Sequence, residues 1–183
     1  MTSEPTDHPK ASLLWGSFTG LGLAAALAAL LIDQALKLWL LFVYDLAERG
    51  AVALTPFFDL VLVWNKGISY GLFQQESDAG QWVLLGLKAA AVILLWIWMA
   101  RVATRWSALS LGLIIGGAIG NAVDRVAYGA VADFAHFHIT TASWSFSWYV
   151  FNLADVAIVV GVAGLLYESL FGGNAVKAPR SGP

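Results

Sequence analysis

The stretch LGLIIGGAIGNAVDR, residues 111–125, decides the fold because it joins a glycine ridge to a polar end. Gly112, Gly116 and Gly120 recur at every fourth position of an apolar segment, a small-xxx-small spacing that lets a second helix approach closely in a membrane. An amide, a carboxylate and a guanidinium follow within the last five residues. The stretch therefore predicts a tightly packed membrane bundle with a polar site at one end of this helix.

The composition around this stretch is that of a membrane protein of one domain. Of the 183 residues, 59% are hydrophobic and only 12% are charged, whereas about a quarter of an ordinary globular domain is charged. The net charge of −2 argues against nucleic acid as a partner, since there is no basic stripe to neutralise phosphates. The chain has no cysteine, which excludes disulfides, thiolate catalysis and cysteine-rich metal sites.

Four segments are apolar and long enough to cross a bilayer, which takes about 17–25 residues each. They cover residues 12–32, 82–100, 107–123 and 148–170. The first continues past a single polar step, so we expect a retained helix over 12–44 rather than a cleaved leader.

The loop charges predict the orientation of these spans. Arg101 and Arg105 lie in the short connection between the second and third spans, which contains no acid. By the positive-inside rule this turn is cytoplasmic, and so are the tails. The predicted topology therefore has cytoplasmic tails at residues 1–11 and 171–183. Its two outer segments cover residues 45–80 and 124–147.

The first outer segment contains a predicted strand. The run from Phe57 to Trp64 is rich in β-branched and aromatic residues, and Pro56 precedes it. Asn65-Lys66-Gly67 then predicts a turn.

Two pairs of polar residues repeat one spacing near the outer ends of the last two spans. Asn121 and Asp124 are three residues apart, and so are Asn152 and Asp155, so each amide shares a helix face with a carboxyl group. Two such pairs in a small bundle indicate a convergent polar site.

Asp33 and Lys37 are four residues apart at the outer end of the first span. They fit either an ion pair that neutralises two charges, each unfavourable at membrane depth, or a pair that binds a polar part of a substrate.

Asp133 and Asp155 are the carboxyl groups best suited to acid–base chemistry. A carboxylate at membrane depth costs about 2.5–3.5 kcal/mol on insertion scales, so an acid there usually has a function. Asp124 precedes Arg125, which favours the ionised form and a bracing role. If Asp133 and Asp155 come within hydrogen-bond distance, they share one proton. The ionised member can then take a proton from an attacking water while the other polarises a carbonyl oxygen, without metal or cofactor.

Other chemistries fit the residues less well. His136 and His138 with Asp133 could bind zinc, but they are a weakly supported ligand set. Ser69 is a candidate serine nucleophile, but no histidine is assigned to it as a base. A small proton-coupled transporter could use the Asp/Asn pairs as a relay, although the chain has no convincing internal repeat. A purely structural subunit would leave these polar groups unexplained.

Five blocks of this sequence, in order, resemble lipoprotein signal peptidase (signal peptidase II). They read DQALK at 33–37, NKGISYGLF at 65–73, GGAIGNAVDR at 116–125, VADF at 131–134 and FNLAD at 151–155. The resemblance implies an all-α membrane protein with four transmembrane helices, a small β-cradle in the first outer loop and a short outer helix in the second. It implies that Asp133 and Asp155 form a catalytic dyad. It also implies substrate-binding or supporting roles for Asp33, Lys37, Asn65, Gly67, Asn121, Asp124, Arg125, Asn152 and Ala154.

The reaction implied by the resemblance is hydrolysis of a diacylglyceryl-modified prolipoprotein just before its lipidated cysteine. The implied protein needs no cofactor or metal, and we expect a monomer among the lipids of the bacterial cytoplasmic (inner) membrane, with its site near the outer face. The chain departs from the family in three places: Val131-Ala132-Asp133 replaces Val-Val-Asp, Ile68-Ser69-Tyr70 replaces Ala-Ala-Phe, and the segment 135–147 is slightly longer than usual.

Overall fold

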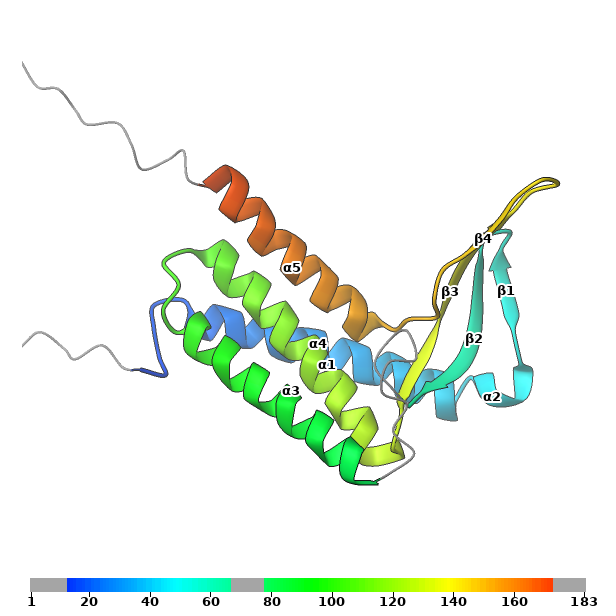
Figure 1. Ribbon diagram of the computed structural model, residues 1–183, viewed down its shortest axis with the longest axis horizontal. Coiled ribbons are helices and arrows are strands. Elements are labelled where there is room, and N and C mark those ends of the chain that lie inside the picture. The colour runs from blue at the N-terminus through cyan, green and yellow to red at the C-terminus, as the bar shows by residue number, and fades with distance from the viewer. Residues whose placement is uncertain (1–12, 67–77, 173–183) are drawn as a thin grey trace, which may run out of the picture.

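A bundle of four long helices carries a small antiparallel sheet at one end (Figure 1). The computed structural model describes residues 13–66 and 78–172, with side chains from Leu85 onward in the second range. The helices are α1 (Thr19–Phe42), α2 (Leu46–Arg49), α3 (Asp78–Met99), α4 (Arg105–Tyr128) and α5 (Leu153–Phe171), and the strands are β1 (Val52–Thr55), β2 (Phe58–Asn65), β3 (Val131–Thr140) and β4 (Ser145–Ser147).

Three of the described helices, α1, α4 and α5, are long and apolar enough to cross a membrane. Helix α3 adds the shorter apolar stretch Leu85–Met99. The chain is thus a mostly helical, multi-pass membrane protein with a small sheet.

Helix α4 is the centre of the bundle because its glycines let two neighbours approach its backbone. A methyl group added at Gly116 would overlap the backbone carbonyl of Ala26 in α1. One added at the next residue, Gly117, would overlap the carbonyl of Ala154 in α5. The close approach predicted from the glycine spacing is therefore confirmed, and α4 makes it on two sides.

The polar end of α4 leads directly into the sheet. Gly129 ends the helix in the left-handed conformation, with φ of 73°, and its N–H donates to the carbonyl of Arg125. Strand β3 begins two residues later at Val131. The sheet then has the order β1-β2-β3-β4 with antiparallel neighbours.

The strand predicted in the first outer segment is confirmed as β2, and β3 pairs with it along most of its length. Asp59 lies opposite His136, and Val63 lies opposite Asp133, with an irregularity in the register between Leu60 and Val63. In the predicted turn that follows, Gly67 lies outside the described residues.

The short helix expected in the second outer segment is wrong. Strands β3 and β4 fill the region after Gly129, and the short helix α2 lies instead in the first outer segment. The reason is non-local: the edge of β2 offers backbone donors and acceptors that β3 satisfies, and a helix could not do so. The β-cradle is therefore built from both outer segments.

The sheet is fixed to the bundle at two places. Leu40 of α1 and Leu46 of α2 form a buried cluster with Phe134 and Ala135 of β3. In addition, the N–H groups of Phe134 and Ala135 donate to the carbonyl of Phe151, at 3.1 and 2.8 Å, and Phe151 N–H donates back to Ala135 at 3.0 Å. The start of α5 is thus tied to the strand that carries Asp133.

Candidate active site

Asp133 and Asp155 are connected by two side-chain amides. Asp133, the third residue of β3, accepts a hydrogen bond of 2.6 Å from Asn152 Nδ2 on Oδ1 and one of 3.1 Å from Asn65 Nδ2 on Oδ2. Asn152 Nδ2 also donates to Asn121 Oδ1 at 3.0 Å, and Asn121 Nδ2 donates to Asp155 Oδ1 at 2.8 Å. The two aspartates that the sequence singled out therefore belong to one polar network.

Asn152 and Asp155 also form the capping box that begins α5. The Asn152 side chain accepts from Asp155 N–H at 3.1 Å, and Asp155 Oδ2 accepts from Asn152 N–H at 3.2 Å. The predicted span began at residue 148, but the helix begins at Leu153, so Asn152 is the cap of the helix and not part of it. The Asn-x-x-Asp spacing at residues 152–155 thus both starts α5 and holds Asp155 in place.

Lys37 lies between two buried carboxylates. Its Nζ is 2.9 Å from Asp33 Oδ2 and 2.8 Å from Asp124 Oδ2, and these three side chains are at most 2% exposed. The same ammonium donates to Asn121 Oδ1 at 3.3 Å. Of the two interpretations of the Asp33–Lys37 pair, its burial supports the ion pair that neutralises charge.

Each of these buried carboxylates holds the backbone next to one of the two candidate catalytic residues, Asp133 and Asp155. Asp124 Oδ2 accepts from the N–H of Ala132, the residue before Asp133, at 3.1 Å. Asp33 Oδ1 accepts from the N–H of Ala154, the residue before Asp155, at 2.9 Å. The ion-paired carboxylates therefore position the start of β3 against α4 and the start of α5 against α1.

Gln34 belongs to this network although no spacing in the sequence singles it out. Its Nε2 donates to Asp124 Oδ1 at 2.9 Å, to the carbonyl of Gly120 at 3.1 Å and to Asp33 Oδ2 at 3.2 Å. The one available signal was its place in the block DQALK, between the two residues of the ion pair.

Arg125 closes the network on the sheet side, where its Nη1 donates to the carbonyl of Asn65 at 3.5 Å. Among the remaining predicted residues, Gly67 lies outside the described range. The alternative nucleophile Ser69 does so too.

The environment of Asp133 raises the pKa of its carboxyl group toward neutral pH. Burial raises its pKa to about 6, and the negative charge of Asp155 acts in the same direction. Hydrogen bonds from Asn152 and Asn65 and the charge of Lys37 oppose the rise in pKa. A general acid needs a pKa close to the working pH, and Asp133 meets this condition.

The zinc interpretation with Asp133 is not supported. His136 Nδ1 lies 3.6 Å and His138 Nε2 lies 2.9 Å from Oδ2 of Asp59, so the histidines face Asp59 instead. The dyad network and the histidines form separate clusters.

Comparison with known proteins identifies the family of this site. The family described as "Signal peptidase (SPase) II" matches residues 25–171, a range that contains every candidate site residue named above. The chain belongs to the signal peptidase II family. It is therefore a membrane peptidase, and the transporter interpretation has no support.

The signal peptidase II relatives are close and nearly full-length. The chain is 65% identical over 158 residues to "Lipoprotein signal peptidase" of Nitrobacter hamburgensis, covering 86% of this chain and 96% of that protein. It is 60% identical over 159 residues to the protein of the same name from Rhodopseudomonas palustris strain TIE-1, covering 87% and 97%.

The fold is similar to that of a solved bacterial membrane enzyme, with a TM-score of 0.66 at 20% identity, covering 92% of this chain and 98% of the other.

Proposed function

We propose that this signal peptidase II cleaves a diacylglyceryl-modified prolipoprotein just before its lipidated cysteine. The names of the relatives that are 65% and 60% identical support the substrate class. The observation that carries the proposal for the site is the amide connection from Asp133 through Asn152 and Asn121 to Asp155. Such a connection favours two carboxyl groups that act on one bond.

In the proposed mechanism, the protonated member of the dyad polarises the carbonyl oxygen of the scissile peptide. The ionised member takes a proton from the attacking water, and the tetrahedral intermediate then collapses as the amine receives a proton. The pKa of about 6 for Asp133 favours it as the member that holds the proton, although the macroscopic titration belongs to the pair. No metal or cofactor takes part in these steps.

Asn65, Asn121, Asn152 and Arg125 act as positioning or substrate-binding residues in this proposal, and the family resemblance extends the set to Gly67. Asp33, Lys37, Asp124 and Ala154 act through them as supports, which agrees with their burial. The substrate's own lipid and signal helix would present the scissile peptide at the membrane surface.

The proposed topology has four transmembrane helices, with α3 as the second, in the bacterial cytoplasmic (inner) membrane. Arg101 in the turn before α4 and Arg105 at the first position of α4 favour a cytoplasmic turn and cytoplasmic tails, which would direct the sheet and the dyad to the outer face. Exposed apolar side chains on α1 and α5 would contact membrane lipids, including Leu27, Leu31 and Leu166, which are 53%, 58% and 59% exposed. The chain would work as a monomer.

The test is prolipoprotein processing in a host depleted of its own lipoprotein signal peptidase. Asp133→Asn and Asp155→Asn should each cause the precursor to accumulate, because acid–base catalysis by a positioned group contributes about 10²–10⁴-fold. Asp45→Asn is the matched control, since Asp45 is exposed and its left-handed backbone, with φ of 54°, suits asparagine.

Processing at the wild-type rate by either dyad variant would overturn the site. Equal accumulation in the Asp45→Asn control would instead show that the assay reports expression and not catalysis. Quantifying each variant in the membrane fraction separates these outcomes.

A further inference from the structure

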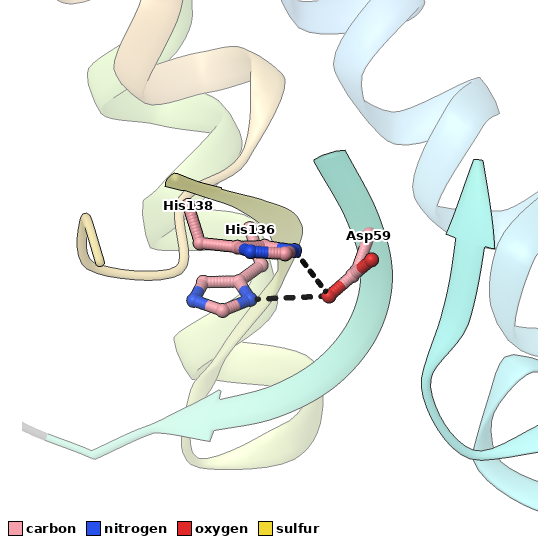
Figure 2. Close-up of side chains that lie close together, drawn as sticks. All are labelled: Asp59, His136 and His138. Atoms are coloured by element: carbon pink, nitrogen blue, oxygen red, sulfur yellow. Dashed lines mark ion pairs between the residues drawn. The ribbon is translucent and has the colours of Figure 1, made fainter. Parts of the chain in front are cut away.

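Three metal-ligating side chains meet on the sheet, apart from the dyad. Asp59 of β2 lies opposite His136 of β3, and His138 follows two positions later on the same face of the strand. Their ligand atoms lie within 4.8 Å of one another. Figure 2 shows both imidazole rings directed at one oxygen of the Asp59 carboxylate.

The spacing of these atoms matches ligands around a single ion. His138 Nε2 and His136 Nδ1 lie 2.9 and 3.6 Å from Asp59 Oδ2. Two ligand atoms that are each 2.0–2.1 Å from a tetrahedral zinc ion lie about 3.3 Å apart. The two observed distances fall on either side of this value. The rings also stack, with centroids 5.1 Å apart, so both present ligand atoms to one side.

The contact between His138 and Asp59 does not satisfy the imidazole. His138 Nε2 is buried and has no hydrogen-bond partner of acceptable geometry, although it lies 2.9 Å from Asp59 Oδ2. A buried nitrogen in this position needs either a better acceptor or a cation to which it can donate its lone pair.

The hydrogen bond on the far side of His136 is compatible with the form of the ring that binds metals. His136 Nε2 lies 2.8 Å from Ser147 Oγ of β4, and that hydroxyl donates to the carbonyl of Trp148 at 3.5 Å. In the neutral tautomer in which Ser147 accepts the Nε2–H, Nδ1 carries a lone pair that faces the Asp59 carboxylate. Two lone pairs that face one another are repulsive unless a cation lies between them. Metal-binding histidines typically make this kind of outer hydrogen bond.

We propose that Asp59, His136 and His138 bind one divalent transition-metal ion, with Zn²⁺ the best match to two imidazoles and one carboxylate, and with water at the remaining position. The three side chains are 21–25% exposed, so an ion can reach them. The ion would cross-link β2 to β3. Since Asp133 lies outside the ligand set, this role is separate from the peptidase chemistry.

The test is metal titration of the full chain, purified in detergent with a tag that contains no histidine. Co²⁺ is the spectroscopic probe, and Zn²⁺ is then added as competitor. The chain suits this experiment because it has three histidines and no cysteine. We expect one Co²⁺ per chain, displaced by Zn²⁺, with the visible absorption of a low-coordinate cobalt site.

Matched variants identify the ligands. Asp59→Asn and His138→Ala should lose stoichiometric binding, whereas His8→Ala, which removes the remaining histidine, should bind as the wild type does. Ser147→Ala keeps all three ligands and should bind about 10–100-fold more weakly, because it removes the outer hydrogen bond. Size-exclusion chromatography shows which variants are folded, and Ser147→Ala keeps the test valid if a ligand variant is not.

Wild-type protein that binds no more Co²⁺ than His138→Ala would overturn the proposal and leave a histidine–carboxylate ion pair. Loss of binding in His8→Ala would overturn it too. Asp133 is not a proposed ligand, so Asp133→Asn should bind Co²⁺ as the wild type does. This variant separates metal binding from the proposed peptidase chemistry.

Discussion

Replacing Lys37 by methionine is the sharpest test of how the site is built. Methionine keeps most of the apolar length of the side chain but removes the charge that lies 2.9 and 2.8 Å from Asp33 and Asp124. All three groups are almost completely buried, so water cannot replace the lost ammonium. Breaking a buried ion pair by removing one partner costs about 3–5 kcal/mol.

The structure places the expected loss near the lower end of that range. Both carboxylates keep other donors, since Gln34 and the Ala132 N–H bond to Asp124 and the Ala154 N–H bonds to Asp33. We therefore expect the free energy of unfolding to fall by about 3 kcal/mol.

Reversible unfolding in mixed detergent, followed by tryptophan fluorescence, measures this loss. Lys66→Met is the matched control, because Lys66 is exposed at the end of β2 and a surface substitution changes the free energy of unfolding by about 0.5 kcal/mol or less. The double variant with Lys37→Met and Asp124→Asn should recover part of the loss, since it leaves one uncompensated carboxylate instead of two. A loss below about 1 kcal/mol in Lys37→Met would refute the buried ion-pair network as the support of the dyad.

Three further predictions concern the dyad and the packing around it. Because the pKa of Asp133 is about 6, activity that depends on its proton should fall as pH rises through that value. Asn65→Ala removes a hydrogen-bond donor that lowers this pKa, so it should shift the fall in a kcat/KM–pH profile to higher pH. An unchanged profile would contradict the assignment of the proton to Asp133. Gly116→Ala should cost about 1–3 kcal/mol in the same unfolding assay, because its methyl group overlaps the Ala26 backbone; Gly86→Ala, with open space around it, is the control. Asp124→Asn should lower folded yield at least as much as turnover, and normal yield without turnover would make Asp124 a catalytic group.

Local spacing was enough to predict the helical part of the site. The glycines of α4 predicted close helix contact, and the two Asn-x-x-Asp pairs predicted a convergent polar cluster, although Asn152 meets Asp155 as the cap of α5 and not on a helix face. The Asp33–Lys37 pair was predictable because residues four apart share a helix face.

The sheet was only partly predictable because its pairing is non-local. Phe58–Asn65 carried enough β-branched and aromatic residues to indicate a strand. Its partner Val131–Thr140 is more than sixty residues away, and no local pattern shows that the second outer segment completes the same sheet. The family resemblance suggested a helix there, which was wrong. Gln34 escaped notice for a related reason, since its acceptors on α4 are 86 and 90 residues away.

The backbone hydrogen bonds between Ala135 and Phe151 close a loop, and the hairpin of β3 and β4 lies within this loop. Asp133 precedes this junction on β3 and Asp155 follows it on α5, so the junction, together with Asp33 and Asp124, holds these two segments together whatever the length of the hairpin. We therefore expect insertions or deletions around the tip between Thr140 and Ser145 to leave the dyad geometry unchanged. The tip of the hairpin is therefore the place at which we expect the chain to accept a reporter peptide without loss of peptidase activity.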